Sequence, residues 1–214
     1  MKYEYIFWDL DGTLTDPGIG ITNSVMHALG KFGIEVSDRR ELYKFIGPPL
    51  VESFETFYNF SHEEAWKAVE YYREYFGVIG LFENEVYEGI PKLLSRLKDE
   101  GYGLYVATSK PLEFSVRILE RFDLLKYFDG VSASSMDEKN SDKASIVADA
   151  LKQSGAKPEK VLMVGDRKHD IIGAHANGVD VLAVLYGYGN REEFAEAGAD
   201  YIAATVEQIY DILR

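Results

Sequence analysis

Four short runs rich in β-branched and aromatic residues recur along the chain and predict buried strands. They cover residues 3–10, 103–109, 160–166 and 179–187. Apolar residues at helical spacing lie between the later runs, first at Leu112, Val116 and Leu119 and then at Ala144, Val147, Ala148 and Leu151. Strands that alternate with helices predict an α/β fold, with a mainly parallel sheet and helices on both of its faces.

The alternation is interrupted between residues 16 and 85, where helical patterns occur without a convincing strand. Ten of the 29 aromatic residues of the chain lie in the segment 50–82. Aromatic residues at helical spacing usually pack inward, so these rings are enough to give a small helical domain its own core. The interval therefore predicts an all-helical insertion.

Joints that contain Gly and Pro flank this insertion, DPGIG at 16–20 and YEGIP at 87–91. Such joints are places where a hinge can absorb changes in backbone dihedral angles. We therefore predict a core domain of residues 1–15 and 86–214 and a lid-like helical domain of residues 16–85.

The composition is that of a folded protein, because 46% of the 214 residues are hydrophobic and 28% are charged. With no apolar run of about 18 residues and no signal-peptide pattern, we expect a soluble, cytoplasmic protein with no membrane partner. The 23 basic and 36 acidic residues give a net charge of −13, which disfavours nucleic acid as a partner. Because the chain has no cysteine, carboxylates are the leading candidates for a nucleophile or a metal ligand.

The segment FWDLDGTLTD ends the first predicted strand with two acidic residues. Residues i and i+2 of a strand point to the same side, so Asp9 and Asp11 can face one cavity. Two carboxylates in one site are costly unless a cation or a shared proton relieves their repulsion. Gly12 and Thr13 then offer a tight turn whose backbone amides could bind an anion. The alternative is an ordinary solvated turn after a strand.

A second acidic pair, Asp166 and Asp170, lies in the segment VGDRKHDI at the end of the third predicted strand. The two residues are four positions apart and can share one side of the next helix. Carboxylate oxygens suit a hard ion such as Mg²⁺, so both residues are candidate metal ligands. An ordinary capped helix start would give the same pattern.

Further polar residues accompany the other strands. Thr108, Ser109 and Lys110 follow the second predicted strand, and Lys143 lies near a predicted helix start. Ligands of parallel α/β sheets bind beyond the carboxyl ends of the strands, so we expect the polar residues at these ends to converge on one site. Taken singly, each of these residues could be an ordinary polar side chain in contact with solvent.

Taken together and in this order, the four polar segments resemble the haloacid dehalogenase superfamily of phosphotransferases over essentially the whole chain. DLDGTLTD is similar to the first family motif, VATSKP to the second, Lys143 in SDKAS to the third and GDRKHD to the fourth. The helical insertion follows the first strand, as in members with a small helical cap. The resemblance implies a Rossmann-like core with an inserted all-helical cap domain.

By this resemblance, Asp9 would be the nucleophile and Asp11 the general acid/base, with Thr108 and Lys143 as phosphate anchors. A carboxylate can attack phosphorus when nearby cations neutralise the transferring oxygens. Asp11 would protonate the leaving alkoxide and later take a proton from water. Family members that act on carbon–halogen or carbon–phosphorus bonds lack an aspartate at the second position, so Asp11 implies a phosphate ester as the substrate.

The resemblance also implies Mg²⁺ as the cofactor. The side chains of Asp9 and Asp166 and the backbone carbonyl of Asp11 would bind the ion, and Asp170 would act from a greater distance or through water. The remaining candidates for phosphate binding are Gly12, Ser109, Lys110 and, in the FIGPPL loop, Gly47.

Within the family, the segments DPGIGI, FIGPPL and TSKP look most like phosphoglycolate phosphatases and the related bacterial 5′-nucleotidase-like phosphatases. SASSMDEKNSDKASIV and Arg167 favour the latter. Because the aromatic rings of the insertion are expected to fill a core, we expect a small phosphate ester such as phosphoglycolate or a sugar phosphate. A 5′-nucleotidase and a phosphosugar mutase are alternatives. A phospho-accepting signalling module of receiver type is an alternative of another class, but it would need only about 120 residues.

Overall fold

The computed structural model describes residues 2–137 and 141–214. Residues 138–140, which belong to the SASSMDEKNSDKASIV segment, lie outside the described residues. Contacts divide the chain into two compact units, residues 1–16 with 86–214 and residues 17–85. The first is called the core unit below, and the second is called the helical unit.

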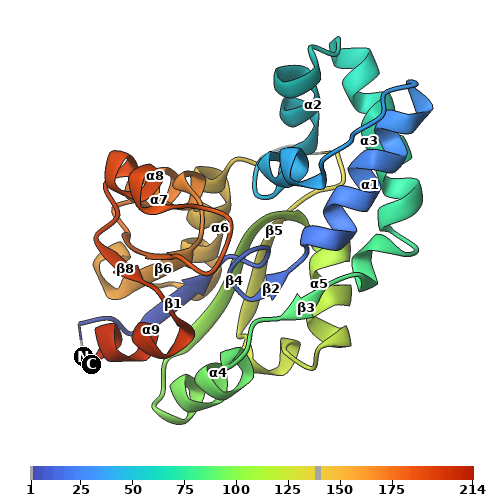
Figure 1. Cartoon of the computed structure of the whole chain (residues 1–214). Helices are drawn as coiled ribbons and strands as arrows, with labels where there is room; N and C mark the ends of the chain where they lie inside the picture. Colours follow the sequence, from blue (N-terminus) through green and yellow to red (C-terminus); the bar gives the residue numbers. More distant parts are fainter. Residues whose placement is uncertain (1, 138–140) are drawn as a thin grey trace. The chain divides into compact units, whose positions relative to one another are not determined.

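The core unit contains a six-stranded sheet with the strand order β5-β4-β1-β6-β7-β8 (Figure 1). Its strands are β1 (Tyr5–Trp8), β4 (Gly103–Pro111), β5 (Gly130–Ser134), β6 (Val161–Gly165), β7 (Asp180–Val184) and β8 (Tyr201–Ala203). Neighbouring strands pair in parallel, which confirms the predicted α/β fold. The apolar pattern did not indicate β5, which is rich in Ser, or β8, which has only three residues.

The central strand β1 lies between β4 and β6, and the three strands run in step. Trp8, the last residue of β1, pairs with Val106 on one side and with Val164 on the other. β4 extends to Pro111, beyond the predicted end of the strand, and its pairing with β5 shifts after Thr108. The polar TSK segment therefore lies in the irregular end of a strand and does not follow it.

Helices cover both faces of the sheet, which explains why the strands are almost continuously apolar. The helices of the core unit are α4 (Ile90–Asp99), α5 (Leu112–Arg121), α6 (Lys143–Ser154), α7 (Lys168–His175), α8 (Arg191–Ala197) and α9 (Val206–Leu213). A buried cluster that includes Phe7, Met163 and Ile146 joins one face of the sheet to α6, α7 and α8. On the other side lie α4, α5 and α9 (Figure 1). The two predicted helices are confirmed as α5 and α6.

The helical unit consists of α1 (Gly18–Lys31), η1 (Arg39–Phe45), α2 (Leu50–Tyr58), α3 (His62–Phe76) and η2 (Gly80–Phe82). A capping box starts α3, because the Ser61 hydroxyl accepts from Glu64 N–H and the Glu64 carboxylate accepts from Ser61 N–H. Two short strands that the pattern did not indicate, β2 (Thr15–Asp16) and β3 (Glu85–Val86), stand at the two ends of this segment.

Aromatic side chains build much of the interior of the helical unit. Of the ten rings in the segment 50–82, three are buried, six are half-buried and Phe82 is 48% exposed. The ring centroids of the buried residues Phe45 and Phe54 lie 5.0 Å apart, within the range of favourable aromatic pairs. The rings therefore contribute mainly to a core, as their helical spacing predicted.

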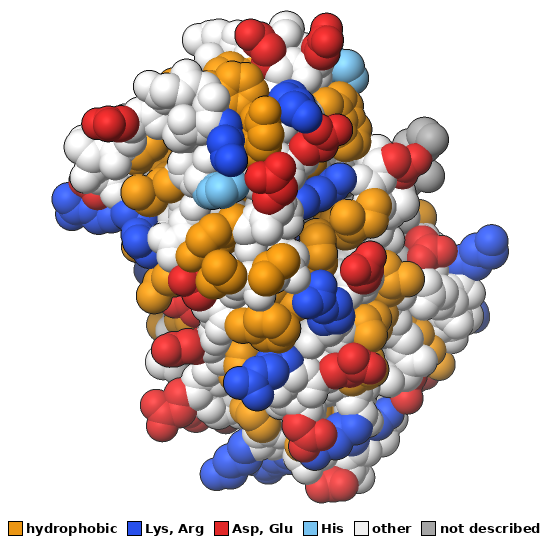
Figure 2. Space-filling view, turned by 90° about the vertical axis from the view of Figure 1, so that its right-hand side faces the viewer, with side chains coloured by type: hydrophobic (Ala, Val, Ile, Leu, Met, Phe, Trp, Pro, Cys, Tyr) orange, Lys and Arg blue, Asp and Glu red, His pale blue; other side chains and the backbone are white. Residues whose placement is uncertain are grey.

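Charged side chains of both signs are interspersed on the face of the molecule shown in Figure 2. Some of these charges form ion pairs, such as that between Lys98 and Asp129 at 2.7 Å. Opposite charges that lie close together partly cancel at a distance, which moderates the field of an acidic chain. Among the described residues, no helix has both the length and the apolar character that a membrane span requires.

Asp142 caps the helix α6, which begins at Lys143. Its carboxylate accepts hydrogen bonds from the Ser145 N–H at 2.9 Å and from the Ser145 hydroxyl at 2.7 Å. Asp142→Ala should therefore lower the free energy of unfolding at pH 7 by about 0.5–2 kcal/mol, as measured by urea denaturation. Asp142→Asn retains an accepting oxygen and should recover most of this loss. Equal stability of the alanine variant and the wild type would contradict the prediction.

The same cap should depend on pH. Hydrogen bonds from Ser145 lower the pKa of Asp142 in the folded protein. The stability from the ionised cap is therefore present above the unfolded pKa of about 4 and is lost as the pH falls through the lower, folded pKa. The stability difference between wild type and Asp142→Ala should shrink as the pH is lowered from 7 toward 3, again measured in urea.

Candidate active site

The segment after β1 forms a compact turn beside Asp166. Asp9 N–H donates to Val164 O at 2.9 Å and so continues the ladder with β6, whereas Gly12 N–H donates to Thr15 O at 2.8 Å and closes the turn. Gly12 has a φ of 81°, and a Cβ there would lie 2.2 Å from Asp166 Oδ2, so only glycine fits. Gly12 therefore contributes through its missing side chain, because the turn already uses its amide.

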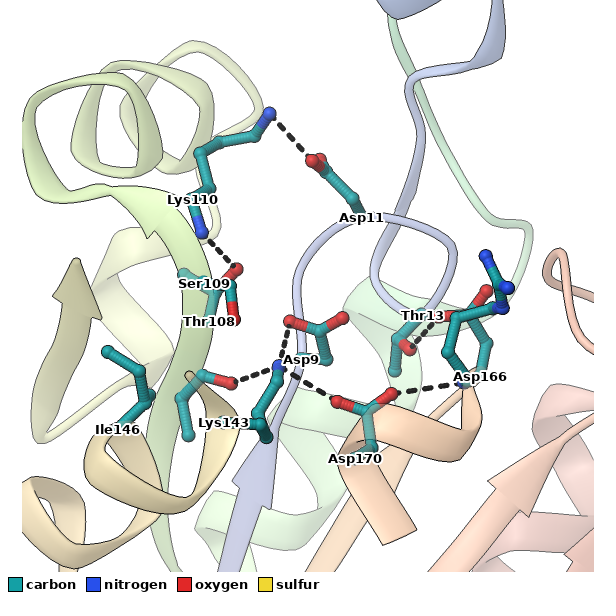
Figure 3. A network of polar contacts seen from close by, with 12 residues as sticks. Asp9, Asp11, Thr13, Thr108, Ser109, Lys110, Lys143, Ile146, Asp166 and Asp170 are labelled. Atoms are coloured by element: carbon teal, nitrogen blue, oxygen red, sulfur yellow. Dashed lines mark hydrogen bonds and ion pairs between the residues drawn. The ribbon is translucent and has the colours of Figure 1, made fainter. Parts of the chain in front are cut away.

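Lys143 joins two of the acidic residues (Figure 3). Its Nζ donates to Asp9 Oδ1 at 2.7 Å and to Ala107 O at 3.0 Å, and it lies 2.8 Å from Asp170 Oδ1. The other oxygen of Asp170 accepts from Arg167 N–H at 3.0 Å. Lys143 itself is only 7% exposed, and the two aspartates are no more exposed than it is. One ammonium group therefore holds two buried carboxylates.

Asp166 directly follows β6 and is fully buried. Its Oδ1 accepts from the Thr13 hydroxyl at 3.3 Å, and its Oδ2 accepts from Tyr188 N–H at 2.8 Å. One carboxylate oxygen from each of Asp9, Asp166 and Asp170 lies within 4.8 Å of the others. The ends of β1 and β6 and the first turn of α7 thus bring three carboxylates to one place.

The irregular end of β4 adds a second lysine to this edge of the sheet. Lys110 Nζ lies 2.6 Å from Asp11 Oδ2, and both side chains are largely buried. The Thr108 hydroxyl accepts from Lys110 N–H at 3.2 Å, and Ser109 O accepts from the Ser134 hydroxyl at 2.7 Å. Lys110 is therefore the charge partner of Asp11, as Lys143 is of Asp9 (Figure 3).

Gly47 is the one predicted site residue that belongs to the helical unit. It lies between η1 and α2 and has a φ of 108°, which favours glycine. The other predicted site residues all belong to the core unit and lie at the carboxyl ends of β1 and β6, at the end of β4 and at the starts of α6 and α7.

Burial dominates the electrostatics of the site. It raises the pKa of Asp9 and of Asp11, and the lysine beside each of them opposes the rise. Burial alone would lower the pKa of Lys143, but the charges of Asp170 and Asp9 outweigh it, so the pKa is raised and the ammonium stays charged. Burial and the charges of Asp170 and Asp9 together raise the pKa of Asp166 well above its ordinary value. A cation would relieve this excess of buried negative charge.

The acidic cluster fits a hard divalent cation. Asp9, Asp166 and Asp170 offer carboxylate oxygens, the type of ligand that Mg²⁺ prefers. Asp11 Oδ1 is buried, and no residue within the described part of the chain forms a hydrogen bond with it. Lys143 already neutralises Asp170 Oδ1, whereas the hydrogen bonds that Asp166 accepts come from neutral groups, so Asp166 is a better candidate for a direct ligand than Asp170.

Sequence reasoning missed the YGYG segment that follows β7. The predicted strand 179–187 ends at Val184 in the structure, and the chain then turns so that Tyr188 N–H reaches Asp166. The two glycines of this segment were the available signal, because a glycine within a strand pattern often marks a close approach of two backbones.

The chain matches a family model described as Haloacid dehalogenase-like hydrolase over residues 6–184. The matched span includes the ends of β1, β4 and β6, which carry most of the site. Among solved structures, that of a predicted phosphatase from Clostridium acetobutylicum is 48% identical in sequence and has a TM-score of 0.97. That match covers 100% of this chain and 99% of the other.

Two curated relatives match along nearly all of the chain. A 5′-nucleotidase from Pseudomonas aeruginosa is 42% identical over 214 residues, which are 100% of this chain and 97% of the relative. The tyrosine-protein kinase PtkA from Mycobacterium tuberculosis is 34% identical over 212 residues, which are 98% of this chain and 72% of the kinase. Both similarities therefore extend over the core unit and the helical unit.

The charge balance of the cluster predicts that Asp166→Asn stabilises the protein in EDTA. The substitution removes a buried charge but keeps both hydrogen bonds, because Asn can accept from Tyr188 N–H and donate to the Thr13 hydroxyl. We expect a higher Tm by scanning calorimetry, at about 2–4 °C for each kcal/mol gained. Asp99→Asn, a control on the exposed end of α4, should change stability by no more than about 0.5 kcal/mol.

The stabilisation by Asp166→Asn should also depend on pH. Because the folded pKa of Asp166 is raised, its ionisation lowers the stability of the wild type as the pH rises above the ordinary range of aspartate. The difference in Tm between Asp166→Asn and the wild type should therefore be smallest near pH 4 and larger at pH 7. A variant less stable than the wild type at pH 7 would show that the carboxylate is not repelled in the fold.

Proposed function

Since the chain belongs to the haloacid dehalogenase-like hydrolase family and has phosphatase relatives, we propose that it hydrolyses phosphate monoesters with Mg²⁺ through an aspartyl-phosphate intermediate. The observation that carries the proposal is the contact between Asp9 and Lys143 inside a cluster of three buried carboxylates. A nucleophile, a phosphate-neutralising cation and metal ligands are thereby assembled at one sheet edge.

Asp9 is the nucleophile in this proposal. One of its oxygens forms a bond to phosphorus while the bond from phosphorus to the leaving oxygen breaks, which gives an aspartyl-phosphate. The Lys143 ammonium, 2.7 Å from Asp9, would neutralise charge on the transferring oxygens. Thr108, which is buried at the end of β4, would donate a hydrogen bond from its hydroxyl to the phosphate.

Asp11 is the proposed general acid and base. It gives a proton to the departing alkoxide, and it then takes a proton from the water that attacks the aspartyl-phosphate. This second attack breaks the bond between phosphorus and Asp9, releases inorganic phosphate and restores the Asp9 carboxylate. Burial raises the pKa of Asp11, which favours the protonated form that a general acid needs, and the contact with Lys110 holds its side chain at a defined place.

The side chains of Asp9 and Asp166 and the backbone carbonyl of Asp11 would hold Mg²⁺, which when bound neutralises charge on the phosphate oxygens and the carboxylates. Asp170 would act less directly, since the Lys143 ammonium already neutralises it, whereas the hydrogen bonds to Asp166 come from neutral groups.

The further candidates for phosphate contact are supported by different observations. Lys110 is close enough to Asp11 to add positive charge near the phosphate, and Ser109 supports the same strand end. Gly12 has no side chain and so leaves room for the Asp166 carboxylate beside the turn after β1. In this proposal the helical unit is a cap domain, and Gly47 is the part of it that would face the phosphate.

We propose a small phosphorylated metabolite as the substrate, such as phosphoglycolate or a sugar phosphate. The support is that nine of the ten aromatic rings in the segment 50–82 are buried or half-buried, so this segment offers little exposed ring surface for a nucleobase. Nucleoside 5′-monophosphates are a second candidate, because the 42% identical relative from Pseudomonas aeruginosa is a 5′-nucleotidase.

A side-by-side assay of phosphate release separates these substrates. With Mg²⁺ present, kcat/KM should be similar for ribose 5-phosphate and for a nucleoside 5′-monophosphate if the leaving group is recognised only loosely. Stacking of the base contributes about 1–3 kcal/mol, so an advantage of about 5- to 100-fold for the nucleotide would favour the 5′-nucleotidase. Hydrolysis of none of these esters, with or without Mg²⁺, would overturn the proposed function.

Asp9→Asn should lower kcat by about 10³-fold or more, because other groups of the site cannot replace a covalent nucleophile. The asparagine retains an oxygen for Lys143, so the Tm should stay close to that of the wild type. Asp99→Asn removes an exposed carboxylate and should keep full activity. Retention of a tenth or more of the wild-type kcat by Asp9→Asn would refute the nucleophile assignment.

A further inference from the structure

The segment 186–189, with the sequence YGYG, packs directly against Asp166 and against the turn after β1. A Cβ at Gly187 would lie 2.3 Å from Gly12 O and 2.4 Å from Asp166 Cβ. A Cβ at Gly189 would lie 2.1 Å from Asp166 O. Neither position has room for a side chain, so both glycines are required for the backbone to approach Asp166 this closely.

Hydrogen bonds tie this segment to both carboxylate oxygens of Asp166. Tyr188 N–H donates directly to Oδ2 at 2.8 Å. The Tyr186 hydroxyl donates to Thr13 O at 3.0 Å, and the Thr13 hydroxyl in turn donates to Asp166 Oδ1 at 3.3 Å. Each oxygen thus accepts one hydrogen bond from the protein, and the orientation of the carboxylate is fixed on both sides.

Side chains anchor the segment at two more points. The ring of Tyr186 packs on that of Tyr87 with a centroid distance of 4.8 Å, and Tyr87 N–H donates to Leu14 O at 3.2 Å. The Tyr188 hydroxyl donates to the Asp16 carboxylate. Three segments that are far apart in the sequence, residues 13–16, Tyr87 and residues 186–189, are thereby joined near Asp166.

We propose that the YGYG segment is a positioning element for the metal site, and that Tyr186 and Gly187 set the affinity for Mg²⁺ through Asp166. The inference rests on the Mg²⁺ site of the proposed function and adds residues that would not touch the ion. With the carboxylate held on both oxygens, the lone pairs left free have fixed directions. A loosened Asp166 would have to be ordered on binding, and loss of such supporting contacts typically lowers metal affinity by about 10- to 100-fold.

Isothermal titration calorimetry with MgCl₂ tests this proposal in the absence of any substrate. Gly187→Ala should raise the Kd for Mg²⁺ by about 10- to 100-fold, because the new Cβ must displace Gly12 or Asp166. Tyr186→Phe keeps the ring and removes only the hydrogen bond to Thr13, so a smaller rise of about two- to tenfold is expected. Gly30→Ala is the matched control, since no atom beyond its chain neighbours and the backbone of its own helix lies within 4 Å of the added Cβ, and it should bind Mg²⁺ like the wild type.

Thermal unfolding in EDTA and in excess Mg²⁺ separates positioning from simple stability. Weakened binding should shrink the rise in Tm that Mg²⁺ gives each variant, whatever its Tm in EDTA. If Gly187→Ala does not fold, Tyr186→Phe decides the matter. An unchanged Kd in the variants, with a lower Tm in EDTA, would overturn the inference but leave the proposed function intact. Failure of the wild type to bind Mg²⁺ would overturn the metal site and this inference together.

Discussion

The constraint on which the structure depends is an excess of buried negative charge at one sheet edge. One carboxylate oxygen from each of Asp9, Asp166 and Asp170 lies within 4.8 Å of the others, and the Lys143 ammonium contacts two of these residues. A buried carboxylate is costly unless it is paired and fully hydrogen-bonded. The surrounding chain supplies those bonds from backbone amides, hydroxyl groups and helix starts. The site is therefore a region of unfavourable electrostatic energy at the ends of the strands. The apolar strands and the two layers of helices around them are otherwise regular.

The local irregularities of the core unit follow from this constraint. The turn after β1 needs a glycine at position 12 because Asp166 occupies the space of a side chain. The end of β4 departs from regular pairing where it delivers Lys110 to Asp11. The start of α6 is fixed by the Asp142 cap, so that Lys143 enters the cluster from its first turn. In each case a strand ends or a helix begins beside a charged side chain of the site.

The sequence predicted four of the six strands of the sheet and named all three aspartates of the acidic cluster, because apolar strands and paired carboxylates at their ends leave a strong local pattern. It did not predict that Lys110 faces Asp11, since a lysine after a strand is normally solvated, and the pairing spans residues far apart in the chain. It also extended β7 to residue 187, because apolar and aromatic residues continue past the true end at Val184. Backbone donors such as Tyr188 N–H have no sequence signature of their own.

The low-dielectric surroundings that make the cluster costly also strengthen each of its electrostatic contacts. An ammonium 2.7 Å from Asp9 acts far more strongly there than it would at the surface. The same reasoning explains why the supporting contacts matter. A buried carboxylate that reorients loses electrostatic interactions that are much stronger than those of a carboxylate in water. Orientation of Asp166 is controlled from two directions, by the turn after β1 through Thr13 and by the YGYG segment through Tyr188 N–H. The orientation of this carboxylate thus depends on closely packed backbone, which explains why Gly12, Gly187 and Gly189 lie beside it.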